Sequence, residues 1–204
     1  MKNIIFIITL LCACTMAIAQ KFTRTDDFKE GTSKFGFEIS GNKSYKVIID
    51  EEYLVFTNKK DKHSVGVKLP VISSQNFKVS YKVIFGSLQR KSDVFGFIFN
   101  GILDEDTREM DGDVIYISQE EFYVCDTAGT KIGKPQKIKI KKGSNIEATI
   151  DVERKGTKTI LTINGMDFSI PALEIKNGYI GFAIKGKNTL KVDEISVTQI
   201  VEED

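Results

Sequence analysis

The chain has 204 residues, and its 29 basic and 28 acidic side chains leave a formal net charge of +1. This balance gives no electrostatic basis for binding nucleic acid or an anionic membrane surface. His63 is the single histidine, which excludes a zinc site of the usual kind and leaves one candidate base for a nucleophilic triad.

Residues 1–19 have the layout of a secretory signal peptide. A basic n-region precedes the largely apolar run 4–11, and an Ala-Ile-Ala cleavage site stands before Gln20. An uncleaved membrane anchor is one alternative, and lipoprotein anchoring at Cys14, in a lipobox-like Leu-Cys-Ala-Cys sequence, is another. We expect a periplasmic or secreted protein with no stable membrane insertion once the signal is removed. Cys125 is then the only cysteine, so no intramolecular disulfide can form.

Apolar residues recur at every second position after Phe35, which indicates β-strands. The clearest runs lie at 45–49, 65–69, 77–85 and 146–152. Successive side chains of a strand point to opposite faces, so each run has one core face and one solvated face, as in antiparallel sheets. No linker or repeat interrupts the pattern. The sequence therefore predicts a single all-β domain over 20–204, with an ordered core over about 25–200.

Short polar and glycine-containing turn signals separate the runs. Asn164-Gly165 lies between two apolar runs, and this pair tolerates the positive φ angles of a type I′ turn, so we expect a two-residue hairpin. Near the C-terminus the apolar positions change from even to odd numbers, which predicts a β-bulge at Asp193-Glu194. Further turns are expected at Ser40-Gly41-Asn42, Asn100-Gly101 and Asp111-Gly112.

Two strands depart from the alternation. Val94–Phe99 is apolar on both faces, and Val114–Ile117 is largely so. Only one face of a sandwich sheet contacts the core. We therefore expect a loop, a neighbouring chain or a ligand to cover the other face of these strands.

The order of these segments resembles the concanavalin A-like (laminin G-like) jelly-roll superfamily, particularly its small exported bacterial modules. The resemblance is carried by Phe77–Phe85, the glycine-centred Phe95–Asn100, Asn145–Arg154 with the hairpin after it, Tyr179–Ile184 and Val192–Val197. It implies an antiparallel two-sheet jelly-roll sandwich with a concave face that holds glycans in many relatives. It carries over no catalytic mechanism, because the chain lacks the Glu-x-Asp-x-x-Glu string of the glucan hydrolases. Members that bind sugars often present tryptophan on the concave face, and this chain has none.

The candidate ligand-binding residues are Tyr116, Tyr123 and Asn100. Tyrosine rings stack on sugar faces and add a hydroxyl group, so Tyr116 and Tyr123 are candidates for a surface platform. Phe95, Phe97 and Phe99 are expected to fill the core, since 14 phenylalanines must pack somewhere.

The strongest enzymatic signal is a row of carboxylates at Glu147, Asp151 and Glu153, which share one face of one strand. Side chains two residues apart on a strand are separated by about 6.5–7 Å. This is near the separation of about 5–5.5 Å between the two carboxyl groups of a retaining glycosidase. The competing interpretation, which we favour, is the hydrated face of an ordinary alternating strand.

A second acidic cluster lies at Asp104, Asp106, Asp111 and Asp113. Ca²⁺ takes six to eight oxygen ligands, and a loop this rich in carboxylates supplies them. The spacing misses the EF-hand pattern and Arg108 stands within it, so a solvated loop is the favoured interpretation. No other cofactor is expected.

Three lysines, Lys137, Lys139 and Lys141, alternate with Ile138 and Ile140. Lysines along a strand commonly protect a sheet edge from pairing with another chain. A site for an acidic glycan or protein is the alternative.

Together these features predict an exported, non-catalytic β-sandwich that binds carbohydrate on one sheet face. A protein-interaction or structural module of the cell envelope, with an envelope or extracellular protein as its partner, is the first alternative. A glycoside hydrolase of concanavalin A-like fold is the second.

Overall fold

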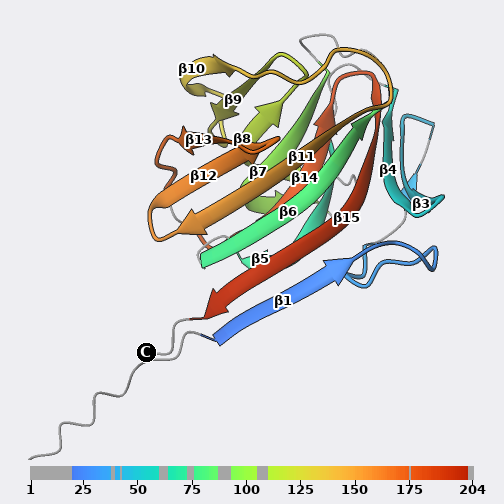
Figure 1. Ribbon diagram of the computed structural model, residues 1–204, viewed down its shortest axis with the longest axis horizontal. Helices are drawn as coiled ribbons and strands as arrows, with labels where there is room; N and C mark the ends of the chain where they lie inside the picture. Colours follow the sequence, from blue (N-terminus) through green and yellow to red (C-terminus); the bar gives the residue numbers. More distant parts are fainter. Residues whose placement is uncertain are drawn as a thin grey trace, which may run out of the picture.

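The computed structural model describes residues 20–37, 40–41, 43–59, 64–72, 76–86, 93–104, 110–174 and 176–201. Within these ranges there are fifteen strands and no helix, and the strands form two antiparallel sheets that face each other (Figure 1). The expected signal segment 1–19 with Cys14, and also His63 and Asp106, lie outside the described residues.

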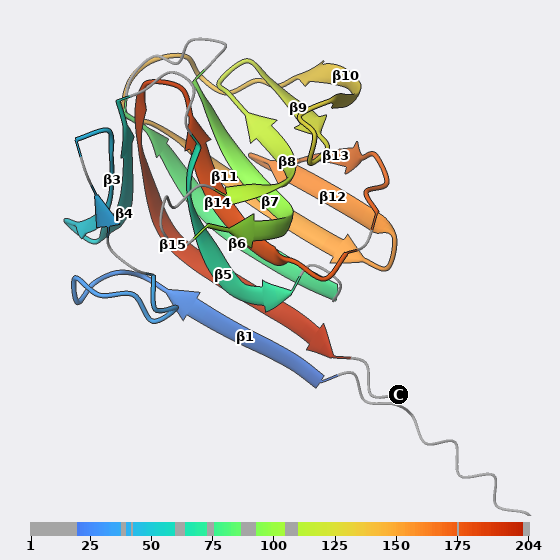
Figure 2. The ribbon, with the colours of Figure 1, turned by 180° about the vertical axis from the view of Figure 1, so that it is seen from behind.

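The larger sheet has nine strands. Along its path they are β13 (Met166–Ile170), β12 (Lys158–Ile163), β11 (Ile146–Lys155), β6 (Asn76–Phe85), β15 (Asn188–Val201), β4 (Tyr53–Asn58), β3 (Tyr45–Asp50) and β2 (Ser40–Gly41). The ninth, β1 (Gln20–Asp26), pairs with the C-terminal part of β15, while β4 pairs with its N-terminal part. The first and last described strands therefore lie side by side (Figures 1 and 2).

The smaller sheet has six strands. Figure 2 views the molecule from behind relative to Figure 1 and shows this sheet. Their order is β10 (Lys131–Lys137), β9 (Glu121–Cys125), β8 (Met110–Ile117), β7 (Val94–Leu103), β14 (Tyr179–Lys185) and β5 (Ser64–Ile72). All pairs in both sheets are antiparallel, as the alternating sequence pattern predicts.

An aromatic cluster holds the two sheets together. Tyr81 of β6 lies parallel to Phe97 of β7, with ring centroids 6.2 Å apart, and meets Phe182 of β14 edge-on at 4.7 Å. Phe95, Phe97 and Phe99 are all fully buried, which confirms that they belong to the core. Such ring pairs add to the stability that area burial alone supplies.

Two local predictions are confirmed. Ile163 pairs with Met166 across Asn164 and Gly165, whose φ angles of 48° and 78° are those of a type I′ turn. The pairing of β15 with β6 shifts register between Asp193 and Ile195, where the bulge was expected. The extra residue restores the inward orientation of the last part of β15.

Two expectations were wrong. Asn100-Gly101 lies inside β7, at a register shift between Phe99 and Ile102, and is not a turn. Asp111-Gly112 lies inside β8, where a Cβ on Gly112 would come within 2.5 Å of the Phe99 carbonyl oxygen, so this glycine allows two backbones to approach closely. The third turn was expected at Ser40-Gly41-Asn42, but Ser40-Gly41 forms the two-residue strand β2, which pairs with β3, so the chain reverses after Gly41, and Asn42 lies outside the described residues.

The pairing of β1 with β15 runs from Gln20, opposite Val201, to Asp26, opposite Ile195.

We predict that Phe97→Ala lowers the free energy of unfolding by about 3–5 kcal/mol, because it removes a fully buried ring from the aromatic cluster. Phe22→Ala is the matched control, since Phe22 is 53% exposed on β1, and a change of under about 1 kcal/mol is expected there. Urea unfolding curves of both variants measure the difference. Equal effects would contradict the assignment of Phe97 to the core.

Candidate functional site

The outer face of the six-stranded sheet carries a second, smaller apolar cluster. Ile98 of β7, Val114 of β8 and Ala183 of β14 form it, and Tyr116 packs against them. This explains why β7 and β8 are apolar on both faces. Ile98 has no exposed surface and the other two have almost none. The cluster is therefore already covered within one chain.

Tyr116 and Tyr123 stand side by side on this outer face. They are directly opposite each other on β8 and β9, and their ring centroids are 5.3 Å apart with a 38° tilt. The pairing continues from Tyr116 to Gly96 on β7 and then to Ala183 on β14. A Cβ on Gly96 would lie 2.9 Å from the Val114 side chain and 3.4 Å from the Tyr116 ring, so the missing side chain leaves room chiefly for Val114 of the apolar cluster.

Three lysines place their ammonium groups over the tyrosine rings of this sheet. Lys131 Nζ lies 4.5 Å from the Tyr123 ring centroid, and Lys185 Nζ lies 5.3 Å from that of Tyr116. A third pair, Lys68 and Tyr179, has a separation of 4.8 Å. Cation–π contacts of this kind hold an ammonium group in place at the surface. We call these six residues the tyrosine–lysine face.

The phenol of Tyr123 is held in its neutral form. Burial, followed by smaller effects of Cys125, Tyr116 and Glu121, raises its pKa to about 12. Burial also raises the pKa of the Cys125 thiol, although Lys185 and Lys131 act in the opposite direction. At neutral pH, Tyr123 therefore keeps a hydroxyl hydrogen to donate, and Cys125 is a buried thiol.

Asn100 does not belong to this face. It is 6% exposed, and its side-chain amide donates to Asp113 and to the Glu174 carbonyl oxygen, while its Oδ1 accepts from the Lys176 amide. All three bonds hold protein segments together. We therefore leave Asn100 out of the proposed binding residues.

The structure describes three of the four acidic residues weighed for calcium, Asp104, Asp111 and Asp113. Asp113 is buried and accepts hydrogen bonds from Asn100 and from the Thr127 amide and hydroxyl, while Asp104 and Asp111 are exposed. Asp106 lies outside the described residues. Among the residues with a described position, no group of three or more His, Cys, Asp or Glu side chains is arranged to hold a metal ion.

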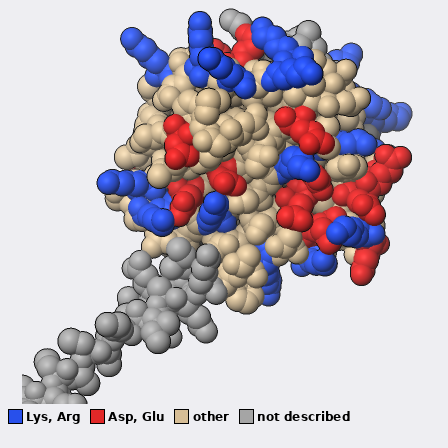
Figure 3. Space-filling view, in the orientation of Figure 1, with Lys and Arg blue, Asp and Glu red and all other residues tan. Residues whose placement is uncertain are grey.

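The carboxylates of β11 lie on the outer face of the nine-stranded sheet. Asp151 forms an ion pair with Lys78 at 3.2 Å, and Glu153 forms one with Lys155 at 2.6 Å. Glu147 is exposed. Figure 3 shows this side of the molecule, where basic and acidic side chains are interspersed.

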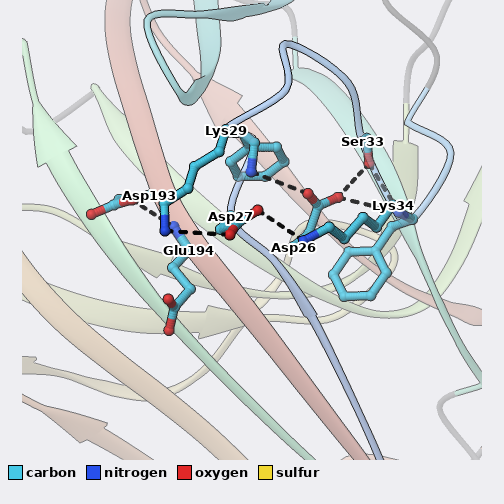
Figure 4. A network of polar contacts seen from close by, with 9 residues as sticks. Asp26, Asp27, Lys29, Ser33, Lys34, Asp193 and Glu194 are labelled. Carbon is cyan, nitrogen blue, oxygen red and sulfur yellow. Dashed lines mark hydrogen bonds and ion pairs between the residues drawn. The ribbon is translucent and has the colours of Figure 1, made fainter.

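A hollow of about 410 Å³ opens on this same face. A loop after β1 forms one wall and is fixed by the buried Asp26, which accepts hydrogen bonds from the Ser33 hydroxyl and the Phe35 amide (Figure 4). Two ion pairs lie at the hollow, Lys82 with Asp193 at 3.1 Å and Lys29 with Asp27 at 3.5 Å, and Glu52 and Glu194 also line it. The pairing with Asp193 raises the pKa of Lys82. Neither Asp151 nor Glu153 lines the hollow.

Sequence reasoning found the two central tyrosines but missed Tyr179 and the three lysines of the tyrosine–lysine face. The outward position of Lys185 could have been predicted. It lies two residues from Ala183, on the same face of the strand, while the core residue Phe182 lies on the opposite face. Lys68 and Lys131 could not be assigned in this way, since their partners depend on which strands pair.

The fold defines the class of this protein: it is an all-β sandwich of two antiparallel sheets, and it is similar to solved structures that include one with a galectin-like fold. No family model matches the chain, and no curated protein matches it in sequence. In the described residues, no helix is both long and apolar enough to cross a membrane.

Three solved structures show what the chain is similar to. A Bacillus subtilis protein of unknown function with a galectin-like fold has a TM-score of 0.64 and 8% identity, over 88% of this chain and 96% of that one. A carbohydrate-binding module from Bacillus subtilis has a TM-score of 0.51 and 12% identity, over 78% of this chain and 92% of that one. The kappa-carrageenase of Pseudoalteromonas carrageenovora has a TM-score of 0.55 and 9% identity, over 95% of this chain and 100% of that one. At these identities the likeness establishes the fold alone.

We predict that Tyr123→Phe makes the protein less sensitive to alkaline unfolding. The ordinary pKa of the phenol is 10.0, against about 12 in the folded chain, so the unfolded chain loses this proton first. The contribution of the neutral Tyr123 phenol to the free energy of unfolding is complete below pH 10 and is lost as the pH rises from 10 to 12.

Urea unfolding at about pH 9 and about pH 11, on either side of the ordinary phenol pKa, measures this effect. The variant should lose less stability between the two pH values than the parent protein, although Tyr81, whose pKa burial also raises, still contributes in both. An unchanged loss would contradict the environment described for Tyr123.

Proposed function

We propose that this protein is an exported, non-catalytic carbohydrate-binding module whose ligand binds the tyrosine–lysine face. The observation that carries the proposal is the Tyr116–Tyr123 pair, in which two half-buried rings from neighbouring strands stand together on the outside of the sheet. Tyrosines exposed in this way combine an apolar ring with a hydroxyl group, which suits the mixed polar and apolar surface of a sugar.

The ligand we propose contacts ring edges and polar groups more than an open ring face. Lys131 and Lys185 lie over the two central rings, and the apolar cluster beneath Tyr116 is buried. The face offers phenol hydroxyls and ammonium groups to a ligand. Both kinds of group donate hydrogen bonds, and sugar oxygens accept them.

Two of the similar structures support this proposal by analogy. One is a carbohydrate-binding module, and the other was solved as a complex with an oligotetrasaccharide of kappa-carrageenan. Because one fold hosts many functions, the residues of the face carry the proposal and the analogy only adds to it.

Export is part of the proposal. It is supported by the basic n-region, the apolar run and the Ala-Ile-Ala site that precede Gln20. Cleavage after Ala19 leaves β1 intact to pair with β15.

We predict that the protein recovered after expression with its own leader begins at Gln20. Intact-mass spectrometry measures this directly. A mass that corresponds to a lipid-modified chain starting at Cys14 would support the lipoprotein alternative, and an unprocessed chain in the cytoplasmic fraction would contradict export.

We predict that the processed protein binds glycans on an array and that Tyr116→Ala combined with Tyr123→Ala weakens this binding at least tenfold. The two rings and their hydroxyls form the centre of the face, so their removal should cost at least about 1.4 kcal/mol. Isothermal titration calorimetry with the strongest array ligand measures the loss.

Tyr53→Ala is the matched control, because Tyr53 also lies under a lysine, Lys191 at 4.9 Å, but on the nine-stranded sheet. It should bind as the parent does. Failure of the protein to bind any glycan, together with a concentration-dependent dimer, would replace the proposal with a protein-interaction role. Glycan binding that survives in the double variant would place the site elsewhere.

A further inference from the structure

We infer that the glycan recognised by the tyrosine–lysine face is anionic and carries carboxylate or sulfate groups. This inference rests on the proposed carbohydrate-binding function and adds a ligand class to it. It follows from a difference between the lysines of the two sheets.

On the nine-stranded sheet, several lysines form ion pairs with neighbouring carboxylates. Lys78 pairs with Asp151, Lys82 with Asp193, and Lys191 with Glu51 at 3.5 Å. This holds even for Lys191, which also lies over the Tyr53 ring. Figure 3 shows the result on the side it views, where red and blue side chains lie close together.

On the six-stranded sheet, the corresponding lysines face tyrosine rings in place of carboxylates. Lys68, Lys131 and Lys185 have no ion pair with any residue that the structure describes, and each lies within 5.3 Å of a ring centroid. Glu121 is the acidic residue on the outer side of β9, and it stands opposite Lys137 of β10. The six residues of the face therefore carry three positive charges and no negative charge, although the whole chain is nearly neutral.

The rings also hold these charges where a ligand can reach them. Lys131 and Lys185 lie over the adjacent rings of Tyr123 and Tyr116, so two ammonium groups flank one ring pair. A cation held over a ring loses less conformational entropy on binding than a free lysine does. An ammonium group without a carboxylate partner also does not have to break an ion pair before it binds an anion. A repeating anionic polymer can engage several such groups at once.

The test compares the processed protein with two lysine variants on an array of neutral, uronate-bearing and sulfated glycans, at about 50 and about 300 mM NaCl. The parent should bind the anionic glycans selectively and more weakly at high salt, because screening shortens the range of the interaction. Lys131→Gln combined with Lys185→Gln should weaken binding about tenfold, at a few-fold for each charge removed.

Lys78→Gln combined with Lys191→Gln is the matched control on the other sheet, and it should bind like the parent. Lys131→Arg combined with Lys185→Arg keeps both charges and should retain the salt dependence, which separates the role of charge from that of side-chain packing. Urea unfolding midpoints establish that all of these variants are folded.

The outcomes are distinguishable. Equal binding of neutral and anionic glycans, or binding that is insensitive to salt, would overturn the anionic ligand while leaving carbohydrate binding intact. Binding to no glycan at all would overturn the proposed function itself. Salt-sensitive binding to an acidic peptide in place of any glycan would assign the same lysines to a protein partner and overturn both.

Discussion

The packing of the two sheets through one aromatic layer determines which side of every strand faces outward. Tyr81 of the nine-stranded sheet contacts Phe97 and Phe182 of the six-stranded sheet. These contacts determine which alternate residues of β6, β7 and β14 point into the core. Because the side-chain period of a strand is two, a slip of one residue would turn every outward group into the core. The position of Tyr116 and Tyr123 outside the sheet is therefore a consequence of the core.

The polar residues near the end of β7 serve this arrangement as structural links. Asn100 adopts a φ of 52°, and a Cβ on Gly178 would lie within 2.4 Å of its backbone, so the segment before β14 packs directly against it. The Asn100 side chain then joins Asp113 of β8 to the segment around Lys176. A buried carboxylate with several donors around it is a satisfied polar group. Two residues that composition alone marks as ligand-binding or metal-binding candidates thus bond to the protein itself.

Period-two alternation was sufficient to predict the β-strands and the bulge near Asp193, and the Asn-Gly pair predicted the hairpin at Asn164-Gly165, because each depends on adjacent residues. The two-sheet sandwich was implied by the resemblance. Pairing across distant strands was not readable in this way. The cation–π contact of Lys131 requires that β10 pair with β9, and the register shift in β7 turned the expected Asn100-Gly101 turn into strand. The two-sided apolar character of β7 was visible, but the covering of its outer side by Tyr116 depends on the β7–β8 register.

The lysines change what the tyrosines can do. A ring whose face is open stacks on the apolar side of a neutral sugar, but the rings of Tyr116 and Tyr123 have ammonium groups over them and the other tyrosine beside them. A neutral sugar would have to displace a cation to stack there, whereas an anionic one gains an attractive partner at the same point. The same contacts that close the stacking surface therefore create a surface suited to negative charge. Charge, more than ring area, distinguishes this face from the ion-paired face of the opposite sheet.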